Sequence, residues 1–362
     1  MSVLAAIAVL AILIIVHELG HFLAARLQGI HVNRFSIGFG PILWKYQGPE
    51  TEYAIRGIPL GGFVGFPDDE EDCPIPPNDP NLMRNRPLLD RAIVISAGVI
   101  ANLIFAYFVL VAQFGIAGMP EASQPGILIP QLASDVSNVA AQAGIKAGDV
   151  ILEANGQKFD RSLTQIETLK QLIENSPGKT IQFTIQRGEQ INTLNVTPAI
   201  GTDGHGRLGI ALAHNGNLVR RRPDNILQAF TKGAQEFERM FTLTLQGFGQ
   251  LITRFTETAP QVGGPIKIVE KGAEIANADP VSLLAFAAFI SINLAFINIL
   301  PLPALDGGQL AFLIIEGLRG KPLPTHIQDG VMQTGLLLIL GLGIFLIVRD
   351  TAQLEGVQKL LQ

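Results

Sequence analysis

The stretch that decides the fold is SVLAAIAVLAILIIVHELGHFLAARL, residues 2–27. It is almost wholly apolar and long enough for one bilayer crossing, which needs about 20 residues of helix. It also contains His17, Glu18 and His21, and polar side chains of this kind are costly inside a membrane and functional by default. Because no Lys or Arg precedes Arg26, the run lacks the basic start of a signal peptide. We therefore expect a retained transmembrane helix.

His17-Glu18-Leu19-Gly20-His21 is an HExxH motif. Positions i and i+4 of a helix lie on one face, so both imidazoles can reach the same Zn²⁺. The neighbouring Glu18 carboxylate can then act as general base on a water that the metal activates. The alternative is an intramembrane polar cluster that relays protons or packs helices. The apolar surroundings favour the metal site.

Hydrophobic residues make up 48% of the 362-residue chain, and they gather near its two ends. Three more segments approach the length of a tilted span: 92–114, 281–300 and 331–348. The middle of the chain reads like a soluble domain, which predicts membrane spans around a globular insert. A net charge of −5 without a basic cluster argues against nucleic acid as a partner, and the single cysteine excludes an intrachain disulfide.

Positive charge in the short loops predicts the orientation of the spans. The N-terminus has no Lys or Arg before the first span, whereas the following loop carries Arg34, Lys45, Arg56, Arg84, Arg86 and Arg91. We therefore expect the N-terminus and residues 115–280 outside, and the loop 303–330 inside. The C-terminus then lies outside.

A catalytic zinc site uses three protein ligands and one open position, so the HExxH motif needs a third ligand from elsewhere. Asp306 in NILPLPALDGG (298–308) is the natural candidate, because Pro301 and Pro303 break the third span just before it. A broken helix can aim a carboxylate at a metal inside a protein-lined cavity. In the alternative interpretation, Asp306 only caps the following helix.

Amides in the spans also have two interpretations. Asn298 can bind a substrate backbone or stabilise a tetrahedral oxyanion, or it can make an interhelical hydrogen bond. Asn102 has the same ambiguity, and there the sequence favours packing. The remaining histidines lie in loop-like contexts and are expected to be solvent-facing rather than ligands: His31, His205, His214 and His326.

The segments between the spans have distinct patterns. Glycine pairs between β-prone runs predict a hairpin over 38–64, whose apolar character suggests contact with the membrane interior. The insert, from about 126 to 211, alternates strands such as GILIPQL, KTIQFTIQR and QINTLNVTP with glycine turns, as in a small α/β domain. Residues 223–255 are amphipathic and are typical of an interfacial helix.

These features together resemble the site-2 proteases, bacterial intramembrane zinc metalloproteases that cut membrane-spanning substrates. The resemblance rests on HELGH at 17–21, NILPLPALDGG at 298–308 and a PDZ-like insert between the second and third spans. IPLGGFV (58–64) and GGPIKIVEKGA (263–273) are also similar to the family, so the likeness covers nearly the whole chain.

The resemblance implies a multi-pass α-helical membrane protein with about four transmembrane helices, a membrane-reentrant β-hairpin element and an inserted extramembrane PDZ-like α/β domain. We expect residues 1–115 to hold transmembrane helices 1 and 2, HExxH and the reentrant element. Residues 116–215 would form the PDZ-like domain and 216–280 an amphipathic interfacial helical segment. Residues 281–362 would hold transmembrane helices 3 and 4 with the LDG motif. Well-known enterobacterial members have two PDZ domains, whereas this chain has room for one.

The resemblance also implies roles for individual residues. His17, His21 and Asp306 would bind one Zn²⁺ per chain, while Glu18 would activate water and Asn298 would hold the substrate at the catalytic site. Residues expected to shape the substrate site are Gly38, Gly40, Gly61, Gly62, Pro301 and Pro303. The hairpin would present the substrate as an extended strand, since strand addition exposes peptide bonds that a helix shields. The peptide groove of the PDZ-like domain would involve Leu208, Gly209 and Ile210.

The expected activity is hydrolysis of single-pass transmembrane proteins, such as anti-sigma factors or signal-peptide remnants, in regulated intramembrane proteolysis. Membrane lipids and an upstream site-1 protease are the other expected partners. The bacterial cytoplasmic membrane is the expected location, with a plastid membrane as the alternative. Three rival classes are a soluble-type zincin, a PDZ receptor with a degenerate metal site, and a transporter. The apolar flanks of HExxH disfavour the first, intact Glu18 and Asp306 the second, and the lack of an internal repeat the third.

Overall fold

The computed structural model describes residues 1–70, 73, 75–132, 139–201, 204–223, 225–259 and 262–353. The chain divides into two compact units. The first, here called the membrane unit, comprises Met1–Gln113 and Asn225–Gln362. The second, here called the insert, comprises Phe114–Asp224.

Within the described residues, four helices of the membrane unit are long and apolar enough to cross a bilayer. They are α1 (Ser2–Leu27), α2 (Leu88–Ala117), α8 (Ser282–Ile299) and α10 (Thr325–Gln353). Each covers a predicted span, and α2 and α10 extend several residues beyond the predicted ends. Large apolar side chains such as Leu337 and Phe345 point outward and are more than half exposed, as lipid-facing positions require.

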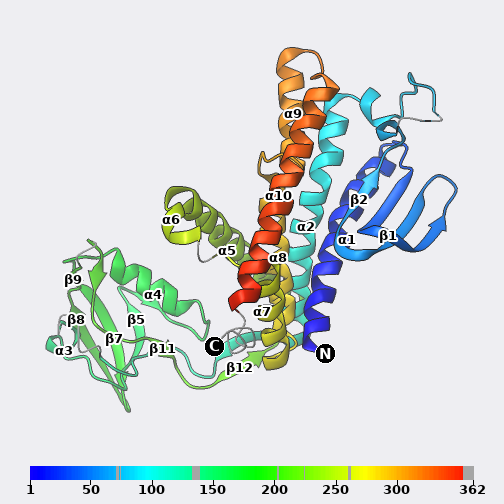
Figure 1. The fold of residues 1–362 in the computed structure, drawn as a ribbon. Helices are drawn as coiled ribbons and strands as arrows, with labels where there is room; N and C mark the ends of the chain where they lie inside the picture. The colour runs from blue at the N-terminus through cyan, green and yellow to red at the C-terminus, as the bar shows by residue number, and fades with distance from the viewer. Residues whose placement is uncertain are drawn as a thin grey trace. The chain divides into compact units, whose positions relative to one another are not determined.

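Small residues allow these helices to approach closely, as is common in membranes. Gly20 of α1 faces Ala97 and Ala101 of α2, and a Cβ on Gly20 would lie 2.7 Å from the Ala101 Cβ. Figure 1 shows α1 and α2 side by side in the membrane unit. The HExxH segment of α1 is therefore packed directly on α2.

In the described part of the membrane unit there are also four further helices and two 3₁₀ turns. The helices are α5 (Ile226–Thr253), α6 (Phe255–Thr258), α7 (Pro265–Ala278) and α9 (Asp306–Arg319), and the 3₁₀ turns are η1 (Pro67–Asp69) and η2 (Met83–Asn85). The Asn225 side chain caps α5 by accepting a hydrogen bond from the Gln228 amide. The amphipathic helix predicted over 223–255 is the single helix α5, and the wider predicted segment 216–280 also contains α6 and α7. Phe241 of α5 packs on Phe296 of α8, with ring centroids 4.8 Å apart.

The predicted hairpin is a more elaborate sheet made of β1 (Arg34–Gln47) and β2 (Glu52–Gly65). Residues 42–47 pair antiparallel with 52–56, 34–37 pair parallel with 52–55, and 34–37 also pair antiparallel with 62–65. Each long strand therefore bends and contributes two segments. Gly38, Gly40 and Gly61 have φ of 86°, 81° and 86°, so the bends use backbone conformations that suit glycine.

The insert contains a mainly antiparallel sheet with the strand order β11-β4-β5-β7-β8, and β6 pairs with β5. These strands are β4 (Ile127–Leu128), β5 (Val150–Ala154), β6 (Gln157–Lys158), β7 (Ile181–Arg187), β8 (Gln190–Val196) and β11 (Ala213–His214). Two short ribbons pair β3 (Met119–Ala122) with β12 (Leu218–Arg221) and β9 (Ala199–Ile200) with β10 (Gly206–Arg207). The helices are α3 (Val139–Gln142) and α4 (Gln165–Glu174).

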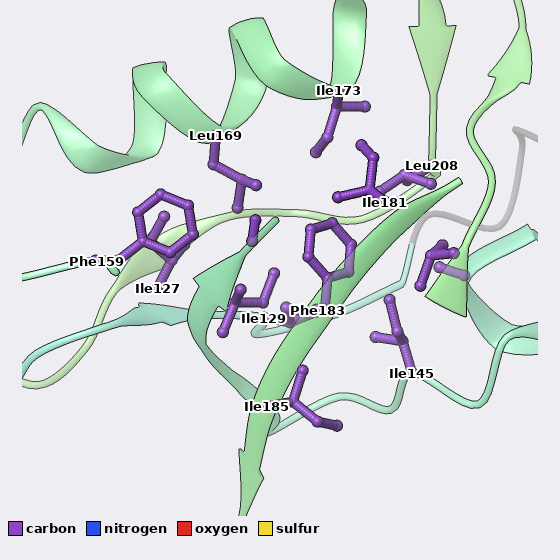
Figure 2. Packing of buried hydrophobic residues seen from close by; sticks show 14 residues of the cluster. Ile127, Ile129, Ile145, Phe159, Leu169, Ile173, Ile181, Phe183, Ile185 and Leu208 are labelled. Atoms are coloured by element: carbon purple, nitrogen blue, oxygen red, sulfur yellow. The ribbon is translucent and has the colours of Figure 1, made fainter. Parts of the chain in front are cut away.

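The insert has its own hydrophobic core. Figure 2 shows Leu169 and Ile173 of α4 pointing at Phe183 and Ile181 of β7, and Phe183 is fully buried. Burying a side chain of this size contributes about 1.5–3 kcal/mol relative to leaving it exposed.

A buried ion pair fixes the loop before β5. Arg187 donates hydrogen bonds of 2.7 Å to both carboxylate oxygens of Asp149, whose side chain is fully buried. Burial alone would raise the pKa of Asp149, but the hydrogen bonds from Arg187 and from the Lys146 amide lower this pKa below its usual range. The carboxylate therefore stays charged at neutral pH.

Candidate active site

The HExxH side chains lie on the protein-facing side of α1. His17 and Glu18 are each 9% exposed, although their helix is otherwise mostly unburied. The His21 Nδ1 atom lies 2.8 Å from the Val94 carbonyl oxygen of α2. A carbonyl only accepts, so Nδ1 carries the proton and the Nε2 lone pair of His21 is left free.

Asp306 is the first residue of α9 and follows a tight connection from the end of α8. Ala304 in this connection has a φ of 69°, an unusual backbone state for a residue with a Cβ. A Cβ on Gly308 would lie 2.9 Å from the Leu302 carbonyl carbon, so the glycine pair lets α9 start against the connection itself. Met332 of α10 contacts the Ala304 amide at 3.3 Å through its sulfur. The connection is therefore packed against α9 and against α10. Asp306 starts α9 and faces His17 and His21.

The three candidate ligands form a nearly equilateral triangle. The Nε2 atoms of His17 and His21 are 3.3 Å apart, and Asp306 Oδ2 lies 3.4 Å from each. Two donors bound about 2.05 Å from a tetrahedral ion are separated by roughly 3.3 Å. Asp306 Oδ2 is buried and accepts no hydrogen bond from the described residues. The donor set therefore fits one Zn²⁺ with a fourth position left open, and no second such cluster occurs in the described part of the chain.

Asn298 and the β-sheet border the same centre. The Nδ2 atom of Asn298 on α8 lies 3.3 Å from His17 Nε2. A Cβ on Gly62 of β2 would lie 2.8 Å from Glu18 Cγ and 2.7 Å from the Ser36 carbonyl oxygen. Glycine at position 62 thus allows the sheet to approach the proposed general base.

Two residues of α2 at this centre were not predicted as site residues. A Cβ on Gly98 would lie 2.7 Å from Cε1 of both His17 and His21. Asn102, for which the sequence favoured packing, is fully buried and places its Nδ2 3.3 Å from His17 Nδ1. The run Ser96-Ala97-Gly98 could have indicated a close helix crossing, but nothing in the sequence shows that it meets the histidines.

The remaining predicted residues lie in the β1–β2 sheet, in the connection after α8 or in the insert. Pro301 is exposed between α8 and α9, and Pro303 packs against Gly335 of α10. Leu208 is buried in the core of the insert, Gly209 has a φ of 71°, and Ile210 pairs with Leu132. His31, on the loop after α1, is partly exposed and places its Nε2 3.7 Å from Asp79 Oδ1.

An HExxH helix that meets a carboxylate from a broken helix, both among apolar spans, defines the class of intramembrane zinc metalloproteases. The family model of peptidase family M50 matches residues 5–342, so the chain belongs to this family. It is a zinc metalloprotease of the site-2 type.

Three relatives illustrate the family. A Nostoc sp. protein named "Putative zinc metalloprotease" is 68% identical over 100% of both chains. The chloroplastic membrane metalloprotease ARASP of Arabidopsis thaliana is 44% identical over 99% of this chain and 81% of its own. The regulator of sigma-E protease, RseP, of Escherichia coli is 30% identical over 94% of this chain and 96% of its own.

Proposed function

We propose that His17, His21 and Asp306 bind one Zn²⁺ and that Glu18 is the general base of peptide hydrolysis in the membrane. The observation that carries this proposal is the triangle of donor atoms with sides of 3.3, 3.4 and 3.4 Å. Those sides match the spacing of ligands around a tetrahedral ion. Asp306 closes the triangle from a helix that lies more than 280 residues later in the chain.

Each residue has a separate chemical task. His17, His21 and Asp306 would hold a Zn²⁺, which would supply Lewis-acid activation of a water and of the scissile carbonyl. Glu18 takes a proton from the attacking water and later delivers it to the leaving amine. The Asn298 amide donates a hydrogen bond to the carbonyl oxygen as that oxygen gains negative charge. Because the site is buried, each of these interactions is stronger than it would be in water.

The substrate is a single-pass transmembrane protein that binds as an extended strand. The segment 62–65 pairs with 34–37 on one side, and a Cβ added to its first residue, Gly62, would lie 2.8 Å from Glu18 Cγ. An added strand there would expose its peptide bonds beside the general base, whereas a helix would shield them. Gly38, Gly40 and Gly61 shape the sheet, and Pro301 and Pro303 shape the facing connection. Anti-sigma factors are one candidate class, as the name of the RseP relative suggests. Signal-peptide remnants are another.

The insert is a PDZ-like domain that selects substrates rather than cutting them. None of the proposed catalytic residues lies within Phe114–Asp224, which form a separate compact unit. Its groove runs along Leu208, Gly209 and Ile210. An upstream site-1 protease would remove bulky outer domains first, so that the shortened substrate passes this selection.

Asp306→Ala is expected to lower zinc occupancy and proteolysis together, because the ion loses one of three protein ligands. Asp306→Asn should retain part of both through its amide oxygen. Zinc content of the purified full-length protein is measured by atomic absorption, alongside cleavage of a transmembrane substrate. Normal zinc content and normal cleavage in Asp306→Ala would place the third ligand elsewhere.

The proposed orientation puts the β-sheet loop inside and the insert outside, in the bacterial cytoplasmic membrane or a plastid equivalent. Single cysteines are introduced into a Cys73→Ser background at exposed Asn78 and at exposed Glu189, in the turn before Asn192. A membrane-impermeant maleimide applied from outside is expected to label Glu189→Cys and to spare Asn78→Cys until the membrane is opened. Labelling of both from one side would contradict the assigned spans.

A further inference from the structure

The Asn102 amide on α2 is buried in an arrangement that leaves one of its atoms unpaired. The side chain is fully buried, and its Nδ2 lies 3.3 Å from His17 Nδ1. Its Oδ1 is also buried and accepts no hydrogen bond from the described residues. A buried carbonyl oxygen without a donor is costly, so this arrangement calls for an explanation.

The chemistry of the neighbouring His17 imidazole explains the unpaired Asn102 oxygen. His17 Nε2 faces Asp306 and His21, so this atom is the one placed to give its lone pair to a metal. A neutral imidazole that does so carries its proton on Nδ1 and needs an acceptor there. An amide NH₂ group cannot accept, whereas the amide oxygen can. A half-turn of the Asn102 amide exchanges its oxygen and nitrogen in place and brings the oxygen to Nδ1.

His21 has the same kind of support from a different source. Its Nδ1 faces the Val94 carbonyl oxygen at 2.8 Å, about two helical turns before Asn102 on α2. The backbone of α2 thus orients one histidine, and a side chain of the same helix is placed to orient the other.

We propose that Asn102 is a positioning residue: its amide oxygen accepts a hydrogen bond from His17 Nδ1–H and holds the ring in the tautomer and orientation that present Nε2 to zinc. This inference rests on the proposed role of His17 as a ligand. Ser291 of α8 donates a 2.8 Å hydrogen bond to the Asn102 backbone carbonyl, which fixes the position of the residue between α1 and α8. Asn102 therefore contacts α1 through His17 and α8, the helix that carries Asn298, through Ser291.

The test measures zinc affinity of the full-length, detergent-solubilised protein by competition with a chromophoric chelator. Asn102→Leu keeps the approximate shape but removes the acceptor, and it is expected to weaken zinc binding about 10–100-fold, the usual effect of losing such a partner. Asn102→Asp keeps an acceptor and loses the donor, so its affinity should stay close to that of the wild type. Gly341→Ala on α10, where an added Cβ meets no atom within 4 Å, is the control and should leave the zinc affinity unchanged. The melting temperature of each zinc-free protein reports folding.

The outcomes separate this inference from the ligand assignment itself. If Asn102→Asp loses zinc as severely as Asn102→Leu, the amide acts as a donor or a spacer and the inference is wrong. Unchanged affinity in Asn102→Leu would also overturn it, since the Gly98 backbone, which lies within reach of the same ring, would then suffice as acceptor. The aspartate variant decides between acceptor and donor even if the leucine variant does not fold. Wild type and Asp306→Ala in the same titration show independently whether the zinc site is assigned correctly.

Discussion

Replacing Glu18 by glutamine is expected to leave zinc bound while peptide cleavage falls by about 10²–10⁴-fold, the usual contribution of a general base. The Glu18 side chain is absent from the ligand triangle, so removing its charge should not remove a metal ligand. Glutamine has nearly the same size and fits the same space beside Gly62. It cannot take a proton from water. Zinc content and the rate of cleavage of one transmembrane substrate are measured on the same preparation.

A matched control and two contrary outcomes make the Glu18→Gln experiment decisive. The Asp306→Asn variant is the matched control, because it makes the same carboxylate-to-amide change at a proposed ligand and should lower zinc content as well as cleavage. Cleavage by Glu18→Gln at near the wild-type rate would remove Glu18 from the mechanism. Loss of zinc in Glu18→Gln would instead make this carboxylate part of the metal site.

Replacing Gly98 by alanine is expected to abolish both zinc binding and cleavage. The added Cβ would lie 2.7 Å from Cε1 of both imidazoles, and it is closer still to the Nε2 atom of His21. Such a separation is well inside van der Waals contact, so both rings or the helix must move. A zinc site does not tolerate this, because its ligands must stay within about 0.2 Å of their bonding distances.

The matched control for Gly98 is Gly341→Ala on α10, where an added Cβ meets no atom within 4 Å. This substitution should leave zinc content and cleavage unchanged. The folding of both variants is compared by thermal melting without zinc. A Gly98→Ala protein that binds zinc like the wild type would show that α2 stands further from the histidines than described.

The sequence predicted the parts of the site that lie in local motifs. HExxH on an apolar helix and a carboxylate after a proline break are visible in short windows, and the structure brings His17, His21 and Asp306 together. The apolar runs also predicted the four spans, because the length needed to cross a bilayer is a property of each segment alone.

The contributions of α2 could not be predicted in the same way. Gly98 and Asn102 gain their meaning from the crossing of two helices, and which faces meet depends on contacts between residues more than 70 positions apart. Glycine and asparagine in a span are equally compatible with simple helix packing. The sheet shows the same limit. Its glycines indicated turns. The parallel pairing of 34–37 with 52–55 requires a bend within the strands, and the alternation of apolar and polar residues does not predict where a strand bends.

On the proposed assignment, the order of the three zinc ligands along the chain also sets when the metal site can be completed during synthesis. The histidines lie in the first helix, whereas Asp306 lies beyond the insert and the third span. A ribosome that has produced the first two spans and the insert has therefore made two proposed metal ligands and the proposed general base without the proposed third ligand. The nascent protein cannot complete its catalytic centre until nearly the whole chain has left the ribosome.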